Sequence, residues 1–266
     1  ELPQPDIVKS MTKYAVEIND PTRIEWFLDK AFDIANNHPK GPVQVSIPTN
    51  FVFTGKVETP TAEGVRTFDK FRKKTHRPHP DPSDIEQLET MLASSVKPII
   101  IAGGGVWYSE AEKMLEDFAA KNNIPIFTPF THLKSVDMAH PMYMGLYDYH
   151  QNPCSRLPSL EADMILFLGG RLDFGLNFGE APLIGSNTTL VCVNPTAQEL
   201  SQNALADVRI CSDIGAFLDF LDTRGKVSAV SSDWAKRIKR SRFESLEPYR
   251  QFLESDTTPV HPLRLC

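Results

Sequence analysis

The chain has 266 residues, of which 41% are hydrophobic and 23% charged, a balance that supports an ordinary globular core. Its formal net charge of −6 gives no overall positive field for nucleic acid, and no apolar stretch approaches the roughly 20 residues of a membrane span. The 4 cysteines show no C-x-x-C spacing, which argues against a zinc site or a disulfide framework and predicts a reducing, cytoplasmic location.

The first segment, residues 1–54, is predicted to hold a partial α-β unit. Asp20 can cap a helix, and apolar residues over 24–35 recur at helical spacing. Asn37 suits the end of this helix, where left-handed backbone is needed. The sequence VQVSIP, residues 43–48, then indicates a strand that ends at its proline.

A linker is predicted at 55–82, where prolines and a basic cluster at 70–74 replace apolar periodicity. The basic cluster is expected to be a solvated face of the linker. Residues 83–225 form the predicted central domain, and 226–266 a helical connection toward a further domain.

Strands and helices alternate regularly after the linker. The predicted strands lie at 97–101, 124–128, 164–168, 188–193 and 207–211. The predicted helices lie at 85–93, 109–122, 213–221 and 234–253, with Ser83, Ser109 and Asp213 as the caps of the first three. The strands are short, apolar runs that we expect to be buried on both faces, with Cys192 and Cys211 serving as small hydrophobes. The fold class is therefore α/β: a Rossmann-like domain with a mainly parallel sheet flanked by helices, preceded by a partial α-β unit.

Three glycines, Gly103, Gly104 and Gly105, follow the first predicted strand of the central domain and precede a helix. Glycine permits close backbone approach, and free N–H groups at a helix start can bind an anion. The run lacks both the G-x-G-x-x-G spacing and the lysine of a P-loop. Two interpretations stay open: tight strand-helix packing, or phosphate binding.

Gly169 and Arg171 leave another strand at its carboxyl end, the edge at which open α/β folds bind ligands. Arg171 can contact a phosphate or pair with a nearby carboxylate. Asn194 ends the next strand, where Rossmann-like domains often place an acid on a ribose; a neutral side chain there weakens dinucleotide binding.

Histidines at 132, 140 and 150 flank a loop-rich stretch without H-x-x-x-H spacing, so no metal site is predicted. Asp148 and His150 can form an acid/base pair or simple loop hydrogen bonds. We predict no catalytic residue from these patterns.

The order of the motifs resembles thiamine-diphosphate-dependent enzymes of the acetolactate synthase group. Residues 11–51, with T-K, A-F and G-P-V-x-V-x-I-P, resemble the end of the pyrimidine-binding domain. KPIIIAGGG, IPIFTP, HPMYMGLY, EADMILFLGGRLDF and ADVRICSDIGAFL follow in the order of the central domain. PVHPLRLC resembles the approach to the diphosphate-binding domain.

The resemblance implies that a parent enzyme binds thiamine diphosphate and Mg²⁺ mainly outside this chain. The family's catalytic Glu belongs upstream and its G-D-G…N motif downstream, so the chain alone is expected to be inactive. The implied central domain is a scaffold, and in some members it binds ADP, CoA or FAD. The implied partners are a 2-keto acid or 2-hydroxyacyl substrate and a second subunit in a homodimer or homotetramer.

Two departures bear on the branch of the family. Acetolactate synthases carry D-D-R after G-x-R, whereas Asp173 is followed here by Phe174 and Gly175. They also tend to carry G-M-H-G where this chain has GLYD at 145–148. LNFGEAP at 176–182 is closer to 2-hydroxyacyl-CoA lyases and benzaldehyde lyase. The alternatives are therefore that lyase branch, or a non-catalytic nucleotide-binding or assembly module.

Overall fold

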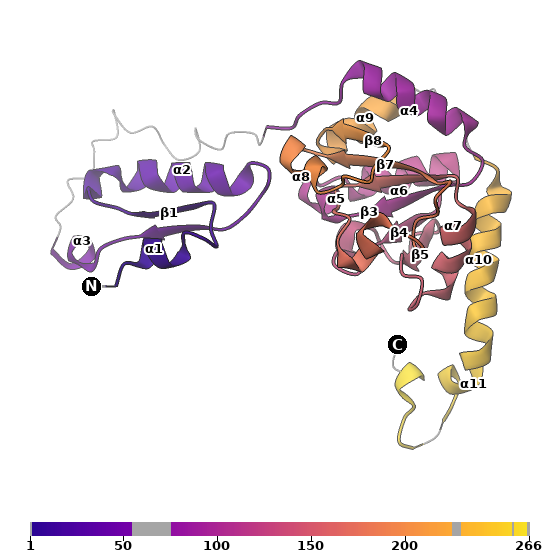
Figure 1. The fold of residues 1–266 in the computed structure, drawn as a ribbon. Coiled ribbons are helices and arrows are strands. Elements are labelled where there is room, and N and C mark those ends of the chain that lie inside the picture. Colours follow the sequence, from indigo (N-terminus) through magenta and orange to yellow (C-terminus); the bar gives the residue numbers. More distant parts are fainter. Residues whose placement is uncertain (1, 55–75, 225–229, 257, 265–266) are drawn as a thin grey trace. The chain divides into compact units, whose positions relative to one another are not determined.

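The computed structural model describes residues 2–54, 76–224, 230–256 and 258–264 of the chain. They fall into two compact units divided between His76 and Arg77 (Figure 1). This division lies within 55–82, the range predicted as the linker. The basic cluster at 70–74 lies outside the described residues.

Unit 1 is a small parallel α-β arrangement. Its elements are α1 (Gln4–Val8), β1 (Tyr14–Glu17), η1 (Pro21–Arg23), α2 (Ile24–Asn36), β2 (Val43–Ser46) and α3 (Thr49–Thr54). β1 and β2 pair in parallel over their full lengths. The predicted cap is confirmed, since Asp20 accepts a hydrogen bond from the Thr22 N–H at 3.0 Å.

The end of α2 differs from the prediction. Asn37 is extended, with φ −76°, instead of left-handed. Lys13, which precedes β1, donates through Nζ to the carbonyls of Ile34 and Asn37. This ammonium satisfies the carbonyl groups that a left-handed residue would otherwise help to satisfy.

Unit 1 has little core of its own. Among its described residues, only Ile18 and Ala31 are buried hydrophobics. Both strands are mostly half-buried, although parallel strands are normally covered on both faces. Unit 1 therefore leaves both of its strands incompletely covered within the described residues.

Unit 2 is built on a six-stranded parallel sheet. Its strands are β3 (Pro98–Ala102), β4 (Ile126–Thr128), β5 (Tyr143–Leu146), β6 (Met164–Leu168), β7 (Thr189–Asn194) and β8 (Val208–Cys211). The order β5-β4-β3-β6-β7-β8 is that of a doubly wound Rossmann sheet. Successive strands are added on one side of β3 as far as β5 and then on its other side from β6 to β8, so the strand order reverses between β3 and β6. The predicted fold class is confirmed.

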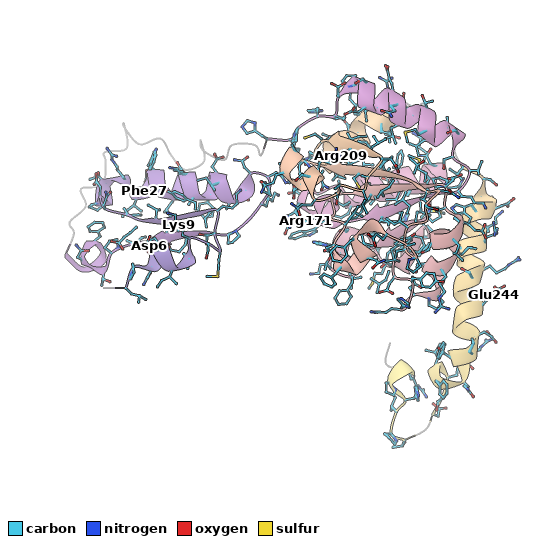
Figure 2. All side chains as sticks on the ribbon, viewed as in Figure 1. Asp6, Lys9, Phe27, Arg171, Arg209 and Glu244 are labelled. Carbon is cyan, nitrogen blue, oxygen red and sulfur yellow. The ribbon has the colours of Figure 1, made fainter. Side chains whose placement is uncertain are left out.

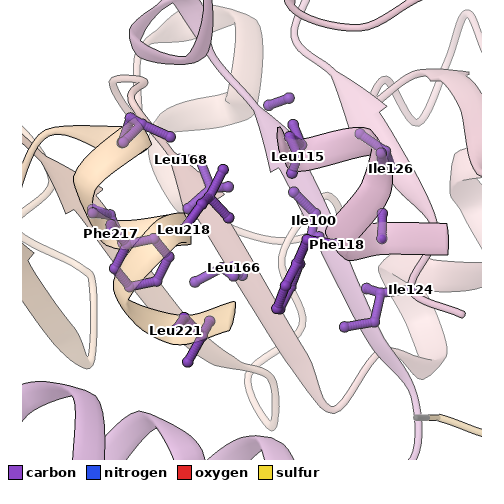
Figure 3. Packing of buried hydrophobic residues seen from close by; sticks show 14 of the residues in the cluster. Ile100, Leu115, Phe118, Ile124, Ile126, Leu166, Leu168, Phe217, Leu218 and Leu221 are labelled. Atoms are coloured by element: carbon purple, nitrogen blue, oxygen red, sulfur yellow. The ribbon is translucent and has the colours of Figure 1, made fainter. Parts of the chain in front are cut away.

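Helices cover both faces of this sheet. One face carries α4 (Pro82–Ser94), α5 (Gly104–Tyr108), α6 (Glu112–Asn122) and α9 (Ile214–Arg224). The other carries α7 (Pro153–Glu161), α8 (Ala197–Ser201) and α10 (Ser232–Leu246). Because strand side chains alternate, Ile100 and Leu166 pack on the first face and Ile99 and Ile165 on the second. Figure 3 shows the first core, with Phe118 and Phe217 from the covering helices.

Trp234 anchors α10 to the sheet. Its ring is buried, and Nε1 donates to the carbonyl of Pro98 at 3.1 Å. Lys97 and Arg237 lie near the ring and both pair with Glu161 of α7. Figure 1 shows α10 beside α7, and η5 (Glu247–Tyr249), α11 (Arg250–Leu253) and η6 (Pro262–Arg264) follow it. The single helix predicted over 234–253 is therefore interrupted.

Two predicted caps are wrong. Asp81, not Ser83, caps α4, and its carboxylate accepts from both the N–H and the hydroxyl of Ser83. Ser109 instead follows the end of α5, and its hydroxyl donates to the buried carboxylate of Asp213 at 2.7 Å; Ala111 is the residue that precedes α6. The predicted cap at Asp213 is confirmed by its bond from the Ala216 N–H.

Several elements were not predicted, among them the strands β1 and β5 and the helices α1, α3, α7 and α8. β5 is short and lies in a stretch read as loop, while α7 contains Pro158 inside the helix. β8 is also less buried than expected, because it is an edge strand; Arg209 and Cys211 are exposed there. No helix in the described ranges is both long and apolar enough to cross a membrane.

Candidate functional site

The carboxyl ends of β3 and β6 meet where the strand order reverses. Gly103–Gly105 follow β3 and Gly169–Gly170 follow β6; we call them the interlocked glycine turns. The N–H groups of Gly105 and Gly103 donate to Gly169 and Leu168 carbonyls at 2.7 and 2.8 Å. A Cβ on Gly105 would lie 2.5 Å from Gly169 Cα. Each turn therefore fills the space that the other leaves open.

Gly104 faces a different neighbour, the imidazole of His132 in the loop after β4. A Cβ on Gly104 would lie 2.2 Å from His132 Cδ2. The ring is held by a 2.8 Å hydrogen bond between Nδ1 and the Thr131 hydroxyl. His132 thus covers the first turn of α5, where an anion would approach its N–H groups.

Asn194 is also used inside the fold. Its amide donates to the carbonyl of Gly170 at 2.9 Å, and the Asn203 amide donates to the same oxygen at 3.0 Å. The Ser135 hydroxyl similarly donates to the Gly103 carbonyl at 2.8 Å. Asn203 and Ser135 carry no local sequence signal; only the folded turns bring them to these carbonyls.

Arg171 is the predicted binding residue whose side chain is not used in contacts within the described part of the fold. Its side chain is exposed (labelled in Figure 2), and it has no hydrogen bond or ion pair with any described residue. Burial lowers the pKa of His132; the Asp173 carboxylate opposes this effect, and the positive charge of Arg171 adds to it. His132 is therefore held largely neutral at neutral pH, and Arg171 carries the positive charge.

The loop after Arg171 forms η4 (Phe174–Gly179). Asp173 caps it by accepting from the Gly175 N–H at 2.9 Å. Asn177 and Phe178 have φ values of 48° and 55°, a region that side-chain-bearing residues rarely adopt. The loop presents Phe174 and Phe178, 75% and 60% exposed.

A hollow of about 500 Å³ lies between α5 and η3 (Leu133–Ser135). Its walls include Trp107, Tyr108, Phe130, His132, Leu133 and Lys134. Trp107 is 51% and Phe130 63% exposed, so the hollow is open to solvent and unusually aromatic. No pattern in the sequence singled it out, because its two walls come from loops after different strands.

His140 and His150, the other two histidines of the loop-rich stretch, lie in turns. The Asp148 carboxylate accepts from the backbone N–H groups of His150 and Gln151, both at 2.8 Å, which favours the loop interpretation over an acid/base pair. His140 Nδ1 accepts from the Met142 N–H. Within the described ranges, no three His, Cys, Asp or Glu side chains gather so that they could hold a metal ion.

Comparison with known proteins finds a family whose model matches residues of unit 2. The family described as "Thiamine pyrophosphate enzyme, central domain" matches residues 85–221. The acetolactate synthase large subunit of Lactococcus lactis is 27% identical over 89% of this chain and 40% of its own length. The oxalyl-CoA decarboxylase of Escherichia coli is 24% identical over 98% of this chain and 45% of its own length.

A solved structure shares the fold. Benzoylformate decarboxylase from Polynucleobacter necessarius superposes with a TM-score of 0.65 at 20% identity, covering 86% of this chain and 41% of that one. The chain therefore spans about two fifths of the length of the curated relatives named above.

Proposed function

We propose a function from the premise that the chain belongs to the thiamine pyrophosphate enzymes, whose central domain matches more than half of it. In this proposal it is the central region of an enzyme that makes or cleaves a carbon–carbon bond next to a carbonyl. The names of its relatives, a synthase and a decarboxylase, support this class. Because the chain covers only 40% and 45% of the length of these two relatives, we propose that it belongs to a longer enzyme.

The described residues do not fit a complete thiamine diphosphate site. Holding the diphosphate through Mg²⁺ needs a set of oxygen ligands, and no group of three candidate metal-binding side chains occurs in the described ranges. We therefore assign the cofactor's binding and chemistry to other parts of the parent. This chain positions those parts and holds no catalytic residue in our proposal.

The observation that carries the scaffold role is the use of the glycine turns in packing. Gly103 and Gly105 after β3 bond or contact the backbone at the end of β6, around Gly169. Asn194 at the end of β7 donates to the Gly170 carbonyl after β6. The glycine contacts join β3 to β6, and the Asn194 bond joins β7 to β6, at the place where other Rossmann sheets open a ligand crevice. Rigidity there suits a domain that fixes the distance between two catalytic domains.

Nucleotide binding, with ADP, CoA or FAD, is the second candidate. One observation favours it: Arg171 is exposed and unpaired within the described part of the chain, at the carboxyl edge of the sheet. Calorimetric titration of the chain with ADP, CoA and FAD discriminates between the two. Heat that disappears in Arg171→Ala supports an accessory nucleotide site, whereas no heat with any of them leaves the scaffold role alone.

The branch of the family is tested on the full gene product. We propose acetolactate synthase-like chemistry first, with a 2-hydroxyacyl-CoA or benzaldehyde lyase as the alternative because of Phe174 and the η4 loop. Thiamine-diphosphate-dependent formation of acetolactate from pyruvate supports the first. Cleavage of a 2-hydroxyacyl-CoA or of benzoin without acetolactate formation supports the second.

A further inference from the structure

We propose that His132 is an acid-released latch that holds the middle of the loop after β4 against α5. The neutral imidazole packs on Gly104, and the imidazolium leaves this position and uncovers the first turn of α5. The inference concerns only unit 2, and it depends neither on the proposed thiamine chemistry nor on a bound ligand.

His132 is the half-buried residue in the middle of its loop. The loop runs from Pro129 to Ser135, and both of these ends are buried. Between them, the four neighbours of His132 are exposed to solvent: Phe130, Thr131, Leu133 and Lys134. The state of this one ring therefore controls how the middle of the loop meets α5.

The imidazole fits against Gly104 because this residue has no side chain. A Cβ on Gly104 would lie 2.2 Å from His132 Cδ2 and 2.4 Å from Nε2, so the edge of the ring occupies the space of a side chain. The other ring nitrogen, Nδ1, lies 2.8 Å from the Thr131 hydroxyl, which is the ring's hydrogen-bond partner among the described residues. The Nε2 edge therefore packs on Gly104 without a hydrogen-bond acceptor in the described part of the chain.

Protonation makes this position of the ring unfavourable. An imidazolium donates from both nitrogens, and its half-buried Nε2–H would face Gly104 without an acceptor, which costs free energy. The ionisable groups around the ring come from three elements, namely Arg171 and Asp173 after β6, Lys134 of η3 and Tyr108 of α5.

These surroundings favour the neutral ring. Burial is the largest effect and lowers the pKa of His132; the Asp173 carboxylate opposes it, and the positive charge of Arg171 adds to it. The latched ring thus holds a proton less tightly than a released ring with the ordinary pKa of 6.5. The latch is therefore at full strength above pH 6.5 and weakens as the pH falls below this value.

The end of the loop stays fixed when the ring leaves. The buried Ser135 hydroxyl donates to the Gly103 carbonyl at 2.8 Å, and neither group titrates near neutral pH. The opening is therefore confined to the middle of the loop, with Ser135 as the pivot.

The test is an NMR titration of the 266-residue chain from about pH 8 to about pH 5, the range in which histidine changes charge. The His132 signals are identified by their loss in His132→Asn, and their midpoint is expected below 6.5. The nuclear Overhauser effect between His132 Hδ2 and the Gly104 Hα protons should be present at the high pH and lost at the low pH. The effects that mark the contact between Ser135 and Gly103 should persist at both.

Variants separate a latch from simple titration of a buried ring. Thr131→Val removes the hydroxyl that holds Nδ1 and should move the His132 midpoint toward 6.5, whereas Thr131→Ser should keep it low. In Gly104→Ala the Cβ takes the place of the ring, so His132 should be released at both pH values and also titrate closer to 6.5.

Three results would overturn the latch. The first is a His132 midpoint at or above 6.5 in the wild type. The second is a contact between His132 and Gly104 that persists below that midpoint. The third is loss of the contact between Ser135 and Gly103 together with it, because the whole loop would then unfold and no latch would be released.

Discussion

Replacing Gly105 by alanine tests the interlocked glycine turns. The new Cβ would lie 2.5 Å from Gly169 Cα, a backbone atom that moves only if the ends of β3 and β6 separate. Overpacking of this kind costs about 1–3 kcal/mol. Weakening the buried 2.7 Å bond from the Gly105 N–H to the Gly169 carbonyl adds about 1 kcal/mol. The expected loss is about 2–4 kcal/mol, a large share of the roughly 5–15 kcal/mol of a typical domain.

Gly104→Ala is the matched control for this prediction. Its Cβ meets the end of the His132 side chain, which is half-buried and can rotate away. The change should cost less than about 1 kcal/mol, because alanine also favours the helix more than glycine does. Urea unfolding, followed by far-UV circular dichroism, compares both variants with the wild type. Equal stabilities of Gly105→Ala and Gly104→Ala would refute the packing role of the turns.

Three further changes probe the rest of unit 2. Trp234→Ala should cost about 3–5 kcal/mol and speed amide exchange in α10; unchanged exchange would show that the helix is anchored elsewhere. Hydrogen bonds from Lys97 and then Arg237 lower the pKa of the Glu161 carboxyl below its ordinary value of 4.5. The ionised carboxylate therefore stabilises the fold at pH values above 4.5, and this stabilisation is lost as the pH falls below 4.5 and the carboxylate is protonated. The difference in unfolding free energy between wild type and Glu161→Gln should therefore shrink between about pH 6 and pH 3 in a urea series; a constant difference contradicts this. Ser109→Ala removes the hydroxyl that donates to the buried carboxylate at the start of α9, and urea unfolding should show a loss of about 1.5–3 kcal/mol instead of none.

Much of the fold was predictable because its strands are strongly apolar. β6 has the predicted bounds, and β4, β7 and β8 differ from prediction by one or two residues. β5 and α7 were missed because a short strand in a turn-rich stretch, and a helix with an internal proline, lack the periodicity that sequence patterns detect. Local capping rules also failed at Ser109, where a tertiary bond to Asp213 decides the conformation.

The candidate site shows a sharper limit of sequence patterns. The sequence pattern identifies the glycines after β3 and β6. A local pattern cannot show that the backbone of one turn occupies the space beside the glycines of the other turn. That result depends on the strand order, which places residues more than 60 positions apart in contact. The aromatic hollow was missed for the same reason, since Trp107 and Phe130 become neighbours of one space only after the sheet forms.

The central claim is that this chain supplies the scaffold of a thiamine-diphosphate-dependent enzyme and that its catalytic groups lie in other segments. Turnover of pyruvate or a 2-hydroxyacyl-CoA should be measured for the full gene product and for the 266-residue chain, each with and without thiamine diphosphate and Mg²⁺. We expect turnover only for the full product and only with the cofactor. Turnover by the 266-residue chain alone, or cofactor-independent turnover by the full product, would contradict the claim.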